Sequence, residues 1–129
     1  MGIVKTNITL SNPRYPNLES IIVESLVDTG ALHLCITEAQ CIQLKLEEGE
    51  KRPVTLADGK VYSIPYVGPI KVDWHGRISY TGAMVLGKQC LLGAIPMEDM
   101  DILVHPAKQT VIANPLHPNI PASVAYVLG

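Results

Sequence analysis

An aspartate directly follows an apolar run in Leu26-Val27-Asp28-Thr29-Gly30-Ala31. A buried carboxylate is costly unless hydrogen bonds or neighbouring charges compensate it, so a functional role is the simplest reason for Asp28 to stand there. Thr29 offers a hydroxyl beside the carboxylate, and Gly30 allows a sharp turn that brings a backbone amide close to it. These residue types predict a carboxylate that is held in place and polarised, as acid–base catalysis requires.

The segments that must position Asp28 have a hydrophobic period of two. Residues 4–10 alternate between inward-facing and polar side chains, which predicts a first strand with one face toward a core. A turn region rich in Pro and Asn follows at residues 12–17. Residues 21–27 are nearly continuously apolar, which predicts a second strand that is covered on both faces and delivers Asp28 into the interior.

Local signals predict one short helix and several hairpins. Thr37 and Gln40 have the spacing of a capping box, so a short helix should begin there. Asp58-Gly59 lies between two apolar runs and favours the positive backbone angles of a tight hairpin. His75-Gly76 should reverse the chain between two alternating strands. Many short strands joined by turns predict a closed, mostly β domain.

A second motif lies about sixty residues further along the chain, where Leu91-Leu92-Gly93-Ala94 forms another apolar run that enters a glycine turn. Its pattern is similar to that of residues 25–31, which suggests an internal repeat in which only the first copy carries an acid. A helix should begin at Pro96, with Glu98 and Asp99 in its first turn, where the helix dipole favours acids. That structural explanation is preferred over a metal site.

The two motifs together resemble the signatures of retropepsin-like aspartic proteases, with Asp28-Thr29-Gly30-Ala31 as the catalytic loop and Leu91-Leu92-Gly93 as the strand that closes the fold. The resemblance covers about residues 2–113 and implies a closed, acid-protease-like β-barrel of short strands and hairpins with one or two short helices. Residues 1–113 are then the protease domain, and residues 114–129 are a Pro-containing C-terminal tail.

The resemblance implies a homodimeric aspartic endopeptidase, because each chain brings one Asp and the chemistry needs two carboxylates that share a proton. Asp28, Thr29 and Gly30 are the implied catalytic residues, with a water as the nucleophile between the two Asp28 carboxylates. Thr29 would form reciprocal hydrogen bonds across the dimer axis. Neither a metal nor another cofactor is expected.

An extended peptide or protein is the substrate that the resemblance implies, and the hairpin around Asp58 would be the flap that closes over it. In many relatives a small polar or acidic residue stands where this chain has Leu32, followed by His33. Apolar pocket lining is expected from Ile36, Leu56, Val61 and Ile95. The implied substrate-binding residues are Ala31, Ala57, Asp58, Gly59 and Lys60.

Composition excludes other partners. The net charge of −2 and the absence of a basic patch interleaved with aromatics exclude nucleic acid. No run approaches the roughly 18–20 apolar residues of a membrane helix, and no signal peptide precedes the first strand, so no membrane partner and a cytoplasmic location are expected. Three cysteines without metal spacing predict reduced, partly buried thiols at Cys35, Cys41 and Cys90.

Two alternatives to the endopeptidase stay open. One is a non-catalytic peptide-binding or dimerisation module that has kept the fold. The other is a thiol or metal hydrolase, for which Cys35 and His33 would share one strand face as a nucleophile and base. None of the four histidines lies in a pattern such as His-Glu-x-x-His, which argues against zinc.

Overall fold

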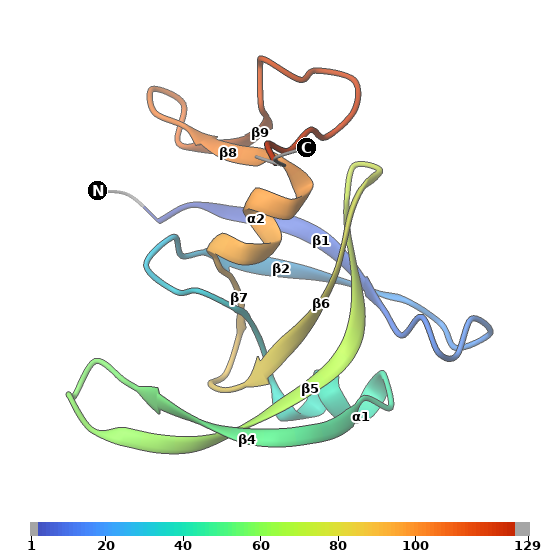
Figure 1. Ribbon diagram of the computed structural model, residues 1–129, viewed down its shortest axis with the longest axis vertical. Helices are drawn as coiled ribbons and strands as arrows, with labels where there is room; N and C mark the ends of the chain where they lie inside the picture. The colour runs from blue at the N-terminus through green and yellow to red at the C-terminus, as the bar shows by residue number, and fades with distance from the viewer. Residues whose placement is uncertain (1–2, 126–129) are drawn as a thin grey trace.

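The computed structural model describes residues 3–125 and confirms a mostly β chain with two short helices (Figure 1). The helices are α1 (Glu38–Gln43) and α2 (Ala94–Met100). The strands are β1 (Lys5–Ser11), β2 (Ile21–Val27), β3 (Leu34–Ile36), β4 (Glu47–Thr55), β5 (Val61–Trp74), β6 (Arg77–Val85), β7 (Cys90–Leu92), β8 (Ile102–His105) and β9 (Thr110–Ala113). In this part of the chain, neither helix is long and apolar enough to cross a membrane.

Six strands close into the predicted barrel. They follow the order β1-β2-β7-β3-β6-β5, and β5 pairs back onto β1 to complete the circle. β4 adds to the free part of β5, so that the two form a long hairpin that extends beyond the barrel (Figure 1). β8 and β9 form a separate two-stranded sheet next to the end of α2.

The barrel interior contains the side chains that the two-residue period predicts. In β1, Ile8 and Leu10 are fully buried while Lys5 and Asn7 are exposed. Burial of each such aliphatic side chain is worth about 1.5–3 kcal/mol, so the alternation fixes which face of the strand turns inward. Among the described residues, the other large aliphatic, Met and Pro side chains that are fully buried are Leu34, Ile36, Leu44, Ile70, Val72, Leu92, Pro96 and Met100.

β2 is covered on one face, contrary to the expectation from its apolar run. Ile22 is 75% exposed and Glu24 is also exposed, whereas Ser25 is buried. The barrel wall has a single inner face, so alternate residues of β2 point to solvent even where they are apolar. The strand nevertheless ends at Val27, as predicted, and leads into Asp28.

The two glycine motifs lie side by side. β2 and β7 pair in parallel, with Ser25 opposite Cys90, Leu26 opposite Leu91 and Val27 opposite Leu92. Both strands therefore end at the same level of the barrel, and the turns that follow them meet. The sequence similarity between the two segments corresponds to this shared position.

The predicted helix start at Thr37 is confirmed. Both capping-box bonds are present, from the Gln40 amide to Thr37 Oγ1 at 3.1 Å and from the Thr37 amide to Gln40 Oε1 at 3.0 Å. The turn at His75-Gly76 is confirmed as well, because both residues have positive φ between β5 and β6. These signals are local, which is why the sequence suffices to find them.

The predicted start of α2 is wrong. The helix begins at Ala94, directly after Gly93, so Pro96 is its third residue and Glu98 and Asp99 lie in its second half. An N-terminal helix dipole therefore does not account for the acids. The backbone amides of Ala94 and Ile95 donate to the loop after Asp28, which places the helix start earlier than the proline.

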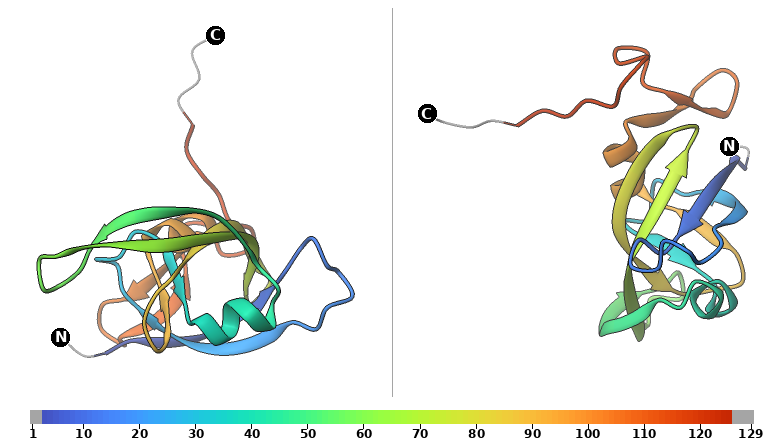
Figure 2. Two further views of the ribbon diagram at one scale, coloured as in Figure 1. Left: turned by 90° about the horizontal axis from the view of Figure 1, so that it is seen from below. Right: turned by 90° about the vertical axis from the view of Figure 1, so that its right-hand side faces the viewer.

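The C-terminal tail is anchored to the domain as far as Ala122. Asp101, in the left-handed conformation after α2, accepts hydrogen bonds from the Asn114 side chain, His117 Nδ1 and the Ala122 amide. Buried Arg77 donates to the carbonyl oxygens of Asp101 and His117. The last described residues then extend away from the barrel (Figure 2).

Candidate active site

The Asp28 carboxylate is held by the backbone of its own loop. The Gly30 amide donates to Asp28 Oδ1 at 3.0 Å, and the Ala31 amide donates to the Asp28 carbonyl at 3.1 Å. The Asp28 amide in turn donates to the Leu92 carbonyl at 3.0 Å. The carboxylate is half-buried, while Thr29 and Gly30 are exposed. The turn therefore has the geometry that the residue types predict.

Gly93 allows the second motif to pack against this loop. A Cβ atom at this position would overlap the His33 carbonyl oxygen and lie 2.8 Å from the Ala31 carbonyl oxygen. Two hydrogen bonds stabilise this contact. The Ala94 amide donates to the Ala31 carbonyl and the Ile95 amide donates to the Leu32 carbonyl, each at 2.9 Å. Glycine stands here because the backbones approach too closely for any side chain.

A cavity of about 620 Å³ separates the Asp28 loop from the end of β4 that leads into the tip of the β4–β5 hairpin. The carboxylate of Asp28 therefore lies on the wall of a cleft. The residues around this cleft come from the Asp28 loop, β3, the hairpin, β6 and the residue after it, and β7. They are Asp28, Gly30, Ala31, Leu32, His33, Cys35, Val54, Thr55, Leu56, Ala57, Met84, Leu86 and Leu91.

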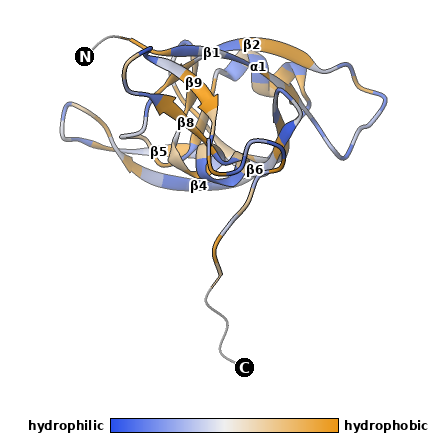
Figure 3. Cartoon of the chain, turned by 90° about the horizontal axis from the view of Figure 1, so that it is seen from above, coloured by the Kyte–Doolittle hydropathy of each residue, from blue (hydrophilic) through white to orange (hydrophobic). Residues whose placement is uncertain are grey.

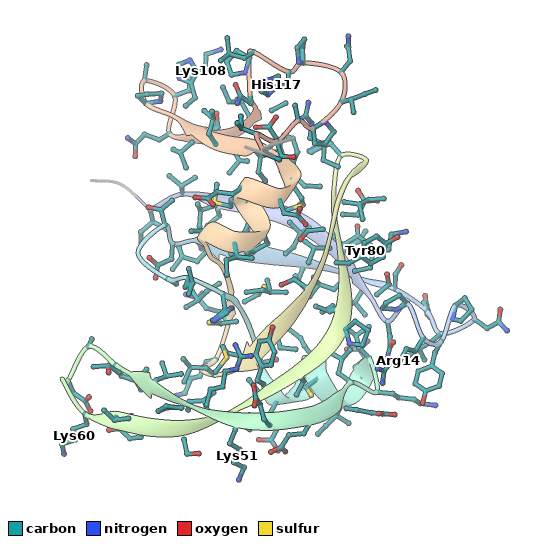
Figure 4. The ribbon with its side chains drawn as sticks, in the orientation of Figure 1. Arg14, Lys51, Lys60, Tyr80, Lys108 and His117 are labelled. Carbon is teal, nitrogen blue, oxygen red and sulfur yellow. The ribbon has the colours of Figure 1, made fainter. Side chains whose placement is uncertain are left out.

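Only some of the expected substrate-binding residues line this cleft. Ala31 and Ala57 do, and so does Leu56. Asp58, Gly59 and Lys60 are exposed at the tip of the hairpin instead, and Figure 4 shows Lys60 at that free end. Of the other expected pocket residues, Ile36 is buried in the core, and Val61 and Ile95 are exposed away from the cleft.

The hairpin tip has a structure that explains its sequence. Only Gly59 takes a positive φ, of 79°, so residues 57–59 form a three-residue loop rather than a two-residue turn. Asp58 contributes its side chain, whose two oxygens accept from the Lys60 amide at 2.8 Å and from the Tyr62 hydroxyl at 2.6 Å. The Tyr62 hydrogen bond, followed by the Lys60 amide, lowers the pKa of Asp58.

Sequence reasoning missed a stack of three side chains beside the cleft. The His33 ring lies edge-on to the Tyr66 ring, with 5.7 Å between centroids, and the Arg52 guanidinium lies 3.8 Å from the Tyr66 centroid. Gly82 makes room, because a Cβ there would overlap Tyr66. Burial, and then the Arg52 charge, lower the pKa of His33. The three residues come from separate segments, so no local pattern announces them.

A second cavity, of about 400 Å³, lies on the other side of Asp28. Asp28 borders both cavities, whereas Thr29 borders only this one. We name this second cavity the apolar pit, since five of its eight lining residues are apolar. They come from residues 3–4, the end of β2 and β8. The pit is lined by Ile3, Val4, Leu26, Val27, Asp28, Thr29, Val104 and Gln109.

The cysteines do not have the environment of a nucleophile. Cys35 borders the cleft, but its Sγ lies 3.9 Å from the His33 carbonyl oxygen as a hydrogen-bond donor, and burial followed by the Asp28 charge raises its pKa. Burial, and then Cys35, raise the pKa of Cys90 to about 12. A raised pKa disfavours the thiolate. Within residues 3–125, no three His, Cys, Asp or Glu side chains gather in a metal-binding arrangement.

Comparison with known proteins supports the fold. No family model and no curated protein sequence matches the chain. Among solved structures, it is similar to the EIAV protease complexed with the inhibitor HBY-793, at 22% identity and a TM-score of 0.51. The match covers 69% of this chain and 79% of the EIAV protease chain. The chain thus has a fold similar to that of a retroviral protease.

Proposed function

We propose that this protein is a homodimeric aspartic endopeptidase that hydrolyses peptide bonds with a water held between two Asp28 carboxylates, one from each copy. The observation that carries the proposal is the position of Asp28. Its carboxylate is oriented by the Gly30 amide and borders two cavities at once. One cavity can receive a substrate and the other can receive the second copy.

The chemistry needs two carboxylates in different protonation states. Like charges at hydrogen-bonding distance do not both ionise, so a pair of Asp28 side chains would share one proton. The ionised carboxylate takes a proton from the water, whose oxygen attacks the peptide carbonyl carbon, while the protonated one donates to the carbonyl oxygen. A proton then passes to the departing amide nitrogen as the C–N bond breaks.

The apolar pit supports a docking surface for the second copy next to Asp28. It places exposed Ile3 and half-buried Val104 next to Thr29. Seen from above, β8 and β9 also carry apolar residues (Figure 3). A two-fold contact through this face would bring Thr29 and Asp28 of both copies together, because each residue near the axis meets its own counterpart.

The substrate is an extended peptide that lies in the cleft. Ala31 and Ala57 border its two sides, and Asp58, Gly59 and Lys60 would reach the peptide when the hairpin closes. Nine of the cleft positions carry apolar side chains or glycine from the loop, hairpin and barrel, which favours apolar substrate residues beside the cleaved bond.

The proposal is tested by the variant Asp28→Asn in a peptide-library cleavage assay between about pH 4 and pH 7. We expect cleavage to fall by about 10³-fold or more, because the pair loses its shared proton and its base. Asp73→Asn is the matched control, since Asp73 also accepts a glycine amide, from Gly76 at 2.8 Å, in a turn outside the cleft. This control should retain full activity.

Two results would contradict the proposal. Undiminished cleavage by the Asp28→Asn variant would exclude the acid pair, and inhibition by chelators or thiol reagents would favour the metal or thiol hydrolase. Peptide binding without any cleavage by the unaltered protein would assign the non-catalytic binding module instead.

A further inference from the structure

His33 differs chemically from the rest of the cleft wall. Apart from Asp28, the side chains that border the cleft are aliphatic or Met, with the exceptions of Thr55, Cys35 and His33. His33 is the one nitrogen-bearing side chain among them. Within residues 3–125, neither of its ring nitrogens makes a hydrogen bond to the protein. The imidazole is therefore half-buried in an apolar wall with its polar atoms available.

Tyr66 and Arg52 support the His33 ring. Its neighbour Tyr66 is held between the His33 ring and the Arg52 guanidinium, and it lies over Gly82 where a larger residue would not fit. Arg52 Nε is paired with Glu50 at 2.7 Å, on the exposed side of β4. A ring supported in this way keeps its orientation toward the cleft, which specific recognition requires.

Resting on the endopeptidase function above, we propose that His33 is a specificity-determining residue that selects substrates with a carboxylate side chain, while the remaining cleft takes apolar side chains. An imidazole N–H donates to a carboxylate oxygen in a charge-assisted hydrogen bond. Arg52, behind Tyr66, adds positive potential on the same side. An apolar substrate residue at this position would leave the imidazole buried without a partner.

The titratable and charged groups around His33 also bear on how the selection depends on pH. They are Asp28 and Cys35, which border the same cleft, Arg52 with its partner Glu50 on β4, and Tyr66 on β5. Burial and Arg52 lower the pKa of His33, so the imidazolium forms only below its usual range. A substrate Glu ionises near pH 4.3, so preference for Glu over Gln should peak in mildly acidic solution and weaken as pH rises.

The experiment compares the wild-type protein with the His33→Gln variant. Library cleavage first shows which substrate position is enriched in Asp and Glu, and matched peptides with Glu or Gln at that position then give the ratio of kcat/KM values. We expect the wild-type ratio to be roughly tenfold in mild acid and to decline toward neutral pH. In His33→Gln the ratio should be close to one.

His75→Gln is the matched control. His75 also lies edge-on to an aromatic ring, that of Trp74 with 4.4 Å between centroids, but it is exposed in the β5–β6 turn. Its variant should keep the wild-type ratio. Cleavage without acid enrichment, or an unchanged ratio in His33→Gln, would overturn the role of His33 alone. A complete lack of cleavage by the wild-type protein would instead overturn the proposed function.

Discussion

The Asp28 carboxylate is positioned by backbone groups rather than by other side chains. The Gly30 amide holds Oδ1, and the Asp28 amide is bonded to the Leu92 carbonyl. Gly93 completes the arrangement by letting α2 start directly against the loop. The geometry at this residue therefore depends on the backbone of two glycines, Gly30 and Gly93.

At Gly93, even one added methyl group should be destabilising. A Gly93→Ala variant would force its Cβ against the His33 and Ala31 carbonyl oxygens, which are backbone atoms that cannot turn aside. We expect a loss of about 1–3 kcal/mol in the free energy of unfolding, measured by urea denaturation. Gly49→Ala is the control, since its Cβ would lie 3.7 Å from the nearest atom. Equal stability of the two variants would contradict this account.

At the scale of elements, the β4–β5 hairpin carries its own organisation. β4 is an edge strand whose charged residues and Pro53 discourage pairing with another chain. The tip is ordered by Asp58, which accepts from the Lys60 amide and the Tyr62 hydroxyl. In the proposed endopeptidase, this hairpin, with its ordered tip, would close over the peptide.

The conformational order of the hairpin tip should depend on pH, because the ionised Asp58 side chain holds it. The folded-state pKa of Asp58 is lowered, first by Tyr62 and then by the Lys60 amide, so its ordering effect is complete above the unfolded value, about 3.9. The effect is lost as pH falls through the lower, folded-state pKa. In a Tyr62→Phe variant we expect the pKa of Asp58 to rise toward its ordinary value, as measured by NMR titration.

Tyr80→Phe provides the comparison for this measurement. Tyr80 is 64% exposed and lies on the barrel wall away from the hairpin tip (Figure 4). Its substitution should leave the Asp58 titration unchanged. A Tyr62→Phe variant that titrates like the wild-type protein would show that the hydroxyl contact does not hold the carboxylate.

For the whole molecule, the proposed function assigns the two cavities next to Asp28 different roles, one for the substrate and one for the second copy. The cleft faces the hairpin, and the apolar pit faces the chain start and the β8–β9 sheet. The tail, tied to Asp101, leaves from the same end of the molecule as β8 and β9 (Figure 1, Figure 2). A dimer built through the pit leaves the cleft open to a peptide.

A charge placed in the pit should break the proposed dimer. Val104→Asp would put a carboxylate into an apolar contact twice, once from each copy, and we expect the dimer dissociation constant to rise by at least about a hundredfold. Analytical ultracentrifugation measures the change, and cleavage activity should fall with the dimer population. Ile22→Asp, which alters an apolar residue 75% exposed on β2, should do neither. If the Val104→Asp protein remains a dimer, the dimer interface does not include the apolar pit.

Local features of the fold could be predicted from the sequence. The Thr37 capping box, the turn at His75, the inward face of β1 and the turn after Asp28 all depend on residues within a few positions of one another. Interactions of that range are encoded in short patterns. The barrel was predicted from the family resemblance of the two glycine motifs. These features follow from backbone preferences and burial, which act wherever the pattern occurs.

Other features became visible in the folded structure alone. It exposed Ile22, moved the start of α2 ahead of Pro96, and assembled His33, Tyr66 and Arg52 beside the cleft. Each of these depends on which segments the closed barrel brings together across long stretches of chain. Contacts of that kind leave no periodic signal in the sequence, because packing in three dimensions selects the partners.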